Sequence, residues 1–171
     1  MRSRRPVVRR ILLLERAGLH LSIHGQVQTS WIREYQVNRI IVIDDKVINE
    51  PLTIQILKIA KPPHVDLVIC GTDRAMGLLA KDAGQPNART LVIFKTIATA
   101  AEMVKLGLDI KTMVIGPTSN KEGTVQMAKN TYFSPEEVEA ARYLNDKKVD
   151  MNIQLLPSEP KISIGSVLEK M

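Results

Sequence analysis

The sequence predicts a single doubly wound α/β domain, in which a mostly parallel sheet is covered by helices on both faces. Short runs rich in β-branched residues alternate along the chain with segments of helical spacing. That alternation is typical of parallel strands joined by helical crossovers. The length of 171 residues suits one domain with one continuous core.

Six apolar runs have the length and composition of buried parallel strands. They are Arg10–Leu14, Arg39–Ile43, Val65–Cys70, Thr90–Phe94, Thr112–Ile115 and Met151–Leu155. A seventh, shorter strand is expected at Asn130–Phe133.

Helical spacing fills several of the intervals between these runs. Val27, Trp31 and Tyr35 lie four residues apart, so they share one helix face. Similar spacing occurs at 52–59 and 98–108. A helix is expected from Ser134, its N-cap, to about Lys147, because proline and two glutamates occupy its first turn. A short closing helix is expected at Ile164–Met171.

The net charge of +6 is concentrated at the start of the chain. Residues 1–10, five of them arginines, are expected to form a basic N-terminal tail, and residues 11–171 the folded domain. The remaining 19 basic residues nearly balance the 18 acidic ones. An arginine-rich tail could bind nucleic acid, and that interpretation remains an alternative. No nucleic-acid partner is expected, because aromatic and basic residues do not interleave as they do in RNA-binding sheets.

The expected location is the cytoplasm. No segment approaches the roughly 18 apolar residues that span a bilayer, and Ile11–Leu14 is too short for a signal-peptide core. The single cysteine, Cys70, excludes an internal disulfide and fits a reducing compartment. A buried structural thiol is the favoured role for it.

Polar residues follow the expected strands, and ligands of open parallel sheets bind beyond the carboxyl ends of the strands. Asp44 and Asp45 follow the second run, and Thr72, Lys95 and Ser119 follow the next three. All five are expected near one rim. The aspartates could orient an active loop or simply form a turn, and no further carboxylates stand at a spacing that suits a metal.

The most informative loop lies between the first run and the Val27 helix. It contains His24-Gly25-Gln26, next to a helix start whose amides and dipole favour anions. Imidazole is a competent nucleophile when one ring nitrogen is unprotonated. His20 lies four residues earlier, a spacing that suits zinc on a helix, but the neighbouring glycines favour a loop and no metal is expected.

The stretch Ile23-His24-Gly25-Gln26-Val27-x-Thr29-x-Trp31 resembles the signature of enzyme IIB components of the mannose/sorbose family of the phosphoenolpyruvate-dependent sugar phosphotransferase system. The resemblance continues through Asn38–Asp45, Asn49–Leu52 and Gln55–Pro63. It covers nearly the whole chain from about Ile11 and is most specific between Ile23 and Pro63.

This resemblance implies a phosphocarrier, a transferase that needs no small cofactor. His24 would accept a phosphoryl group from phosphorylated IIA and pass it to a sugar bound by the membrane IIC and IID subunits. Gly25, Gln26, Asp44 and Asp45 would bind or support the phosphoryl group. The protein would be cytoplasmic, held peripherally at the inner face of the membrane through the permease.

One stretch departs from the family. Arg-Ile-Asp-Asp-Arg-Leu usually precedes the histidine motif, whereas this chain has Ala17-Gly18-Leu19-His20-Leu21-Ser22. The second arginine is therefore Leu21, and a charge-assisted donor is lost. Arg16 and His20 could substitute for it. The departure leaves a second interpretation open, that of a degenerate or regulatory IIB relative that docks IIA without efficient transfer.

Overall fold

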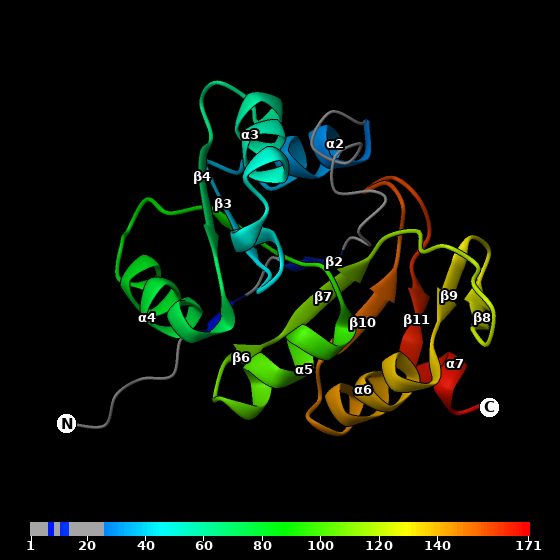
Figure 1. Ribbon diagram of the computed structural model, residues 1–171. Helices are drawn as coiled ribbons and strands as arrows, with labels where there is room; N and C mark the ends of the chain where they lie inside the picture. Colours follow the sequence, from blue (N-terminus) through cyan, green and yellow to red (C-terminus); the bar gives the residue numbers. More distant parts are fainter. Residues whose placement is uncertain (1–6, 9–10, 14–25) are drawn as a thin grey trace.

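A seven-stranded sheet forms the centre of the part of the chain that the structure describes (Figure 1). The computed structural model describes residues 7–8, 11–13 and 26–171, with side chains from Thr29 onward. The strand order is β11-β10-β7-β2-β5-β3-β4. All neighbours pair in parallel except β10 and β11. The strands are β2 (Ile11–Leu13), β3 (Arg39–Ile43), β4 (Asp66–Cys70), β5 (Thr90–Phe94), β7 (Thr112–Ile115), β10 (Asp150–Ile153) and β11 (Ile162–Ser163).

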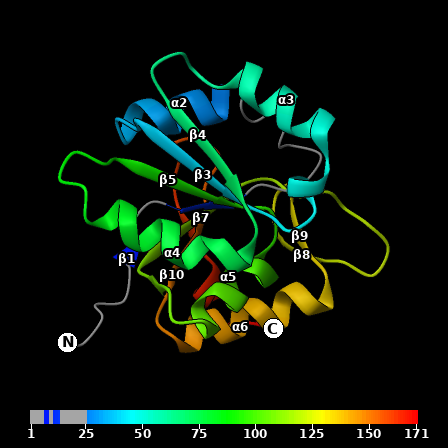
Figure 2. The same cartoon turned by 60° about the vertical axis from the view of Figure 1, so that its left-hand side comes forward.

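Helices cover both faces of this sheet, so the doubly wound prediction is confirmed (Figure 2). One face carries α2 (Gln26–Glu34) and α3 (Pro51–Ala60), the latter preceded by a short 3-10 helix, η1 (Val47–Asn49). The other face carries α4 (Thr72–Ala83), α5 (Ile97–Lys105), α6 (Pro135–Asp146) and α7 (Ile164–Leu168). None of these helices is long and apolar enough to cross a membrane.

The adjacent strands β3 and β5 divide their side chains between two hydrophobic clusters. In β3, Ile40 and Val42 pack with α2 and α3, whereas Ile41 and Ile43 pack with the helices of the opposite face. β5 alternates in the same way. Successive residues of a strand point to opposite faces, so a strand covered on both sides must be apolar throughout. This is why the parallel strands appear in the sequence as unbroken apolar runs.

The described residues form four further strands outside the central sheet, of which only β9 was expected from the sequence. β1 (Val7–Val8), within the expected tail, pairs in parallel with β6 (Asp109–Ile110). β8 (Val125–Ala128) pairs antiparallel with β9 (Thr131–Phe133). β9 confirms the strand expected at Asn130–Phe133, but it belongs to this local hairpin, which lies outside the central sheet. Asn130, with φ of 60°, makes the tight turn between the two strands.

Long-range polar contacts fix the helices on the sheet. The Trp31 indole of α2 is buried and donates a hydrogen bond to the carbonyl of Leu155 beyond β10 (3.1 Å). The Arg39 guanidinium at the start of β3 pairs with buried Asp82 of α4 (2.9 Å). The spacing of apolar residues in the sequence did not predict α4, because one of the residues that this helix buries beside Leu79 is the small Ala75.

The start of α6 provides a test of the fold. Ser134 accepts a hydrogen bond from the Glu137 amide (3.2 Å), and the Glu137 carboxylate accepts one from the Ser134 amide (2.9 Å). The Ser134 N-cap is confirmed, and the structure adds the reciprocal hydrogen bond of Glu137 that makes it a capping box. Ser134→Ala should lower the free energy of unfolding by about 1 kcal/mol, measured by urea denaturation. Ser158→Ala, in an exposed turn, is the matched control, and equal stability of the two variants would contradict the assigned role.

Candidate functional site

Four neighbouring strands of the sheet end at the same level. The register places Ile43 of β3 beside Phe94 of β5, and Leu13 of β2 beside both Phe94 and Ile115 of β7. The loops that follow β3, β5 and β7 therefore start side by side. This is the rim that the sequence predicted, and it is the usual ligand-binding edge of an open parallel sheet.

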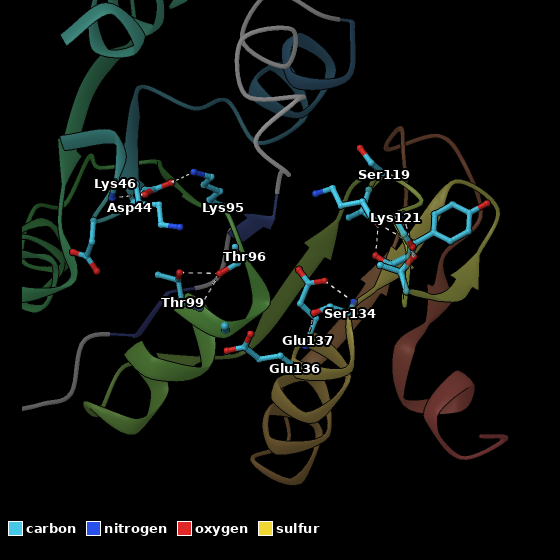
Figure 3. Close-up of a pocket in the computed structure, with 15 residues that line it drawn as sticks. Asp44, Lys46, Lys95, Thr96, Thr99, Ser119, Lys121, Ser134, Glu136 and Glu137 are labelled. Carbon is cyan, nitrogen blue, oxygen red and sulfur yellow. Dashed lines mark hydrogen bonds and ion pairs between the residues drawn. The ribbon is translucent and has the colours of Figure 1, made fainter. Parts of the chain in front are cut away.

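A cavity of about 500 Å³ opens at this rim (Figure 3). It is bounded by the loops after β3, β5 and β7, the hairpin strand β9 and the starts of α5 and α6. Its lining residues are Asp44, Asp45, Lys46, Lys95, Thr96, Ala98, Thr99, Thr118, Ser119, Lys121, Thr124, Tyr132, Ser134, Glu136 and Glu137. Hydroxyl groups, lysines and carboxylates dominate this lining, so the cavity suits a polar or charged ligand.

A buried ion pair forms the wall on the β3 and β5 side. The Lys95 ammonium lies 3.2 Å from Oδ2 of Asp44, and the two side chains are only 10% and 5% exposed. The other carboxylate oxygen of Asp44, Oδ1, accepts hydrogen bonds from the amides of Lys46 (2.7 Å) and Val47 (3.2 Å). Asp44 therefore forms the turn after β3 and also lines the cavity, and its role in orienting an active loop stays a prediction.

Asp45 is committed to a different contact. Its carboxylate accepts hydrogen bonds from the Thr72 amide (2.8 Å) and the Thr72 hydroxyl (3.0 Å), and so joins the β3 loop to the start of α4. Gly71 permits this close approach, because a Cβ at that position would lie 2.6 Å from the Asp45 carboxylate. Thr72, expected near the rim, is held by Asp45 and does not line the cavity.

Two helices begin at the cavity. The Thr96 hydroxyl caps α5 by accepting a hydrogen bond from the Thr99 amide (3.1 Å), and the two threonine hydroxyls lie 2.9 Å apart. The capping box of Ser134 and Glu137 opens α6 on the opposite wall. Amides at helix starts favour negative charge, so both starts add positive potential near the cavity.

The structure brings together some of the predicted residues and adds others. Asp44, Asp45, Lys95 and Ser119 line the cavity. Sequence reasoning missed the contributions of Lys46, Lys121, Thr124 and Tyr132. Tyr132 could have been predicted only together with the β8–β9 hairpin. Thr118 holds this hairpin against the loop after β7: the Thr118 hydroxyl accepts a hydrogen bond from the Tyr132 amide (2.6 Å) and donates one to the Tyr132 carbonyl (2.5 Å).

Four predicted site residues, Arg16, His20, His24 and Gly25, lie outside the described residues. Gln26 is described as the first residue of α2. The described flanks are the carboxyl end of β2 at Leu13 and the start of α2. β2 lies between β5 and β7 in the sheet, and the loops that follow these two neighbours both line the cavity.

Cys70 is buried at the end of β4, as expected. Burial raises the pKa of its thiol to about 11, although the nearby Arg74 opposes the shift. The thiol therefore remains protonated at neutral pH and is a poor nucleophile. Among residues 29–171, no cluster of three or more histidine, cysteine or acidic side chains could hold a metal ion.

Comparison with known proteins gives a consistent result. The family model described as "PTS system sorbose subfamily IIB component" matches residues 19–171. The sorbose-specific EIIB component of Klebsiella pneumoniae is 27% identical over 142 residues, which cover 83% of this chain and 86% of that protein. The mannose-specific EIIAB component of Escherichia coli K12 is 24% identical over 151 residues, 87% of this chain and 46% of that protein.

A solved structure has the same fold. The crystal structure of the IIBSor domain of the sorbose permease from Klebsiella pneumoniae superposes with a TM-score of 0.83 at 23% identity, and the match covers 95% of this chain and 97% of that one. The agreement over nearly the full length of both chains supports the strand order and the helix layers described above.

The environment of Cys70 makes a testable prediction. At about pH 8, the folded protein should react with a disulfide reagent about 100-fold more slowly than the unfolded chain, because two pKa units separate 11 from the ordinary 9.0. Absorbance of the released thiol gives the rate, with Cys70→Ser as the blank. Equal rates in buffer and in denaturant would contradict the assigned burial.

The same pKa shift links the stability of the protein to pH. Because the pKa of the Cys70 thiol is higher in the folded state, the stability linked to this group is complete below about pH 9 and is lost as the pH rises through 11.

Proposed function

Because the chain belongs to the sorbose subfamily of phosphotransferase-system IIB components, we propose that it is a phosphocarrier in which His24 accepts a phosphoryl group from phosphorylated IIA and passes it to a sugar. IIB components of this type are phosphotransferases. The proposal adds the carrier residue, its donor and its acceptor.

The observation that carries the proposal is the position of β2. This strand, the last described element before His24, ends between β5 and β7 at the rim where Asp44, Lys95 and Ser119 line a polar cavity. α2 begins at Gln26, two residues after His24. The amides of this helix start would favour the phosphoryl oxygens, and Gly25 would let the backbone approach them.

The first transfer needs little covalent machinery. An unprotonated ring nitrogen of His24 attacks the phosphorus of the phosphohistidine on IIA, and a new N–P bond forms. The old N–P bond breaks, and its electron pair stays on the imidazole of IIA. That imidazole takes up a proton and the second ring nitrogen of His24 releases one, so charge balances. Alignment and donors around the phosphoryl oxygens supply most of the catalysis.

The second transfer reverses the roles. A sugar hydroxyl oxygen attacks the phosphorus, the His24 N–P bond breaks, and the hydroxyl proton replaces the phosphoryl group on the imidazole. The sugar would be held by the membrane IIC and IID subunits, so this protein would act in the cytoplasm at the inner face of the membrane. The mannose-specific relative combines IIA and IIB in one protein by name, which supports IIA as the donor.

The supporting residues fall into two groups. Gly25 and Gln26 would present backbone amides to the phosphoryl group, and Arg16 and His20 would supply charge in place of the arginine that the family has at position 21. Asp44 would act from the cavity wall through Lys95. Asp45 would act indirectly, because its carboxylate is engaged by Thr72.

A second candidate is a regulatory or degenerate IIB that docks IIA without efficient transfer. The observation that favours it is the pair of leucines, Leu19 and Leu21, where the family has an acid and an arginine. Docking of IIA could survive this change while transfer slows.

The carrier proposal is tested by direct phosphorylation. With phosphoenolpyruvate, the two general phosphotransferase proteins and a mannose-family IIA domain, the protein should gain an acid-labile, base-stable phosphoryl group, detected by mass spectrometry. His24→Ala should abolish the label, because no other residue is proposed to accept it. His64→Ala, an exposed histidine on a distant loop, should label normally. A folded wild type that stays unlabelled beside a labelled control IIB would refute the carrier proposal.

The second candidate is tested by restoring the family residues. If transfer is impaired, Leu19→Asp/Leu21→Arg should raise the labelling rate by about tenfold, because an arginine adds charge-assisted hydrogen bonds to the phosphoryl oxygens. Leu21→Met is the control for a change in size without charge. Unchanged labelling in the double variant, with wild type already labelled as fast as a control IIB, would eliminate the degenerate interpretation.

A further inference from the structure

The Lys95 ammonium is one of three buried side-chain polar atoms that make no hydrogen bond within the described residues. Its side chain is nine-tenths buried, and the one contact given to it by the described part of the chain is the ion pair with Oδ2 of Asp44 at 3.2 Å. Neither atom has a well-directed hydrogen bond within the described residues. An ammonium carries three donors, and leaving donors unmade in a buried place costs free energy. A buried ammonium with donors to spare is therefore suited to bind an anion that enters the cavity.

The position of Lys95 indicates what that anion is. Lys95 follows β5 directly and lines the cavity, and β5 is the neighbour of β2 in the sheet. Figure 3 shows the Lys95 and Asp44 side chains extended toward one another from adjacent strand ends. Thus a buried cation stands beside the strand that leads to His24.

Polar groups beside Lys95 complete an anion-binding wall. Only one hydrogen of the Thr96 and Thr99 hydroxyls lies between their oxygens, 2.9 Å apart, so the other remains to be donated elsewhere. The start of α5 lies on the same wall. Of the other carboxylates in the lining, those of Glu137 and Asp45 are engaged with the Ser134 amide and with Thr72, and that of Glu136 is exposed at the start of α6.

We propose that Lys95 is a phosphoryl-binding residue of this cavity. One N–H donor of its ammonium stays with Asp44, and the others bind the oxygens of the phosphoryl group that His24 carries. Asp44 is the positioning residue, since its Oδ1 is fixed by two backbone amides and its Oδ2 fixes the ammonium. This inference rests on the proposed function for the identity of the group, whereas the anion site itself can be measured without any transfer.

The first measurement uses inorganic phosphate and the unphosphorylated protein, followed by NMR titration. Lys95→Met should weaken phosphate binding by about tenfold or more, since a charge-assisted hydrogen bond is lost, and Lys95→Arg should recover most of it. Lys81→Met is the matched control, because it removes an exposed lysine of α4 that does not line the cavity and should leave the affinity nearly unchanged.

Two further variants separate binding from folding. Lys95→Met leaves the buried Asp44 carboxylate without its counter-ion, so Asp44→Asn/Lys95→Met provides a neutral pair that should fold and still lack phosphate binding. Asp44→Asn alone retains an oxygen that can accept the turn hydrogen bonds and keeps Lys95. It should bind phosphate more weakly than the wild type and more tightly than Lys95→Met, because the ammonium is present but is no longer fixed by the carboxylate.

The outcomes separate the two proposals. Wild-type protein that does not bind phosphate, or that binds it as well as Lys95→Met does, overturns the role of Lys95. If phosphate binding depends on Lys95, phosphoryl transfer from IIA to His24 should slow about tenfold in Lys95→Met and recover in Lys95→Arg. Normal transfer in Lys95→Met overturns the link to the carried phosphoryl group. A wild type that never labels at His24 but binds phosphate through Lys95 refutes the carrier function alone.

Discussion

The parallel pairing of β2 between β5 and β7 is the constraint on which the rest of the structure depends. A strand in this position is buried on both faces, so the strands around it must be apolar throughout and the helices must divide between two faces. The connection from β2 crosses to β3 through α2 on one face, whereas the connection from β5 crosses to β7 through α5 on the other. Adjacent strands whose connections diverge leave a crevice at their carboxyl ends.

The walls of that crevice are fixed by a small number of polar contacts. Asp44 uses one oxygen to hold the turn after β3 and the other to hold the Lys95 ammonium after β5, so one carboxylate joins two strand ends. Asp45 holds the start of α4 through Thr72, where only a glycine at position 71 leaves room. Thr118 holds the hairpin against the loop after β7. Each loop is thus tied to a rigid element, which suits a site that must align a phosphoryl group without moving far.

Such a scaffold fits a carrier that works by positioning. Transfer between two histidines requires alignment, oxygens held by donors and exclusion of water, rather than an elaborate set of catalytic groups. The cavity supplies a buried cation and a helix start, and α2 begins at Gln26, two residues after His24 in the chain. Because leucines replace charged residues of the family at positions 19 and 21, binding of the phosphoryl group would depend more on these elements of the scaffold.

The sequence by itself determined the architecture and the family. Unbroken apolar runs predicted six of the seven strands of the central sheet to within one or two residues, because burial on both faces favours such runs, whereas the short edge strand β11 was not predicted. The N-cap of α6 could be predicted because Ser134, Pro135 and Glu137 lie within one helical turn of the sequence. The histidine motif indicated the family because its residues are contiguous in the chain. Only the tertiary structure decided that Asp44 and Lys95, about fifty residues apart, form one buried pair, and that β9 belongs to a separate hairpin. The physical reason is that strand order and loop closure bring these residues together, and neither leaves a mark in local composition or periodicity.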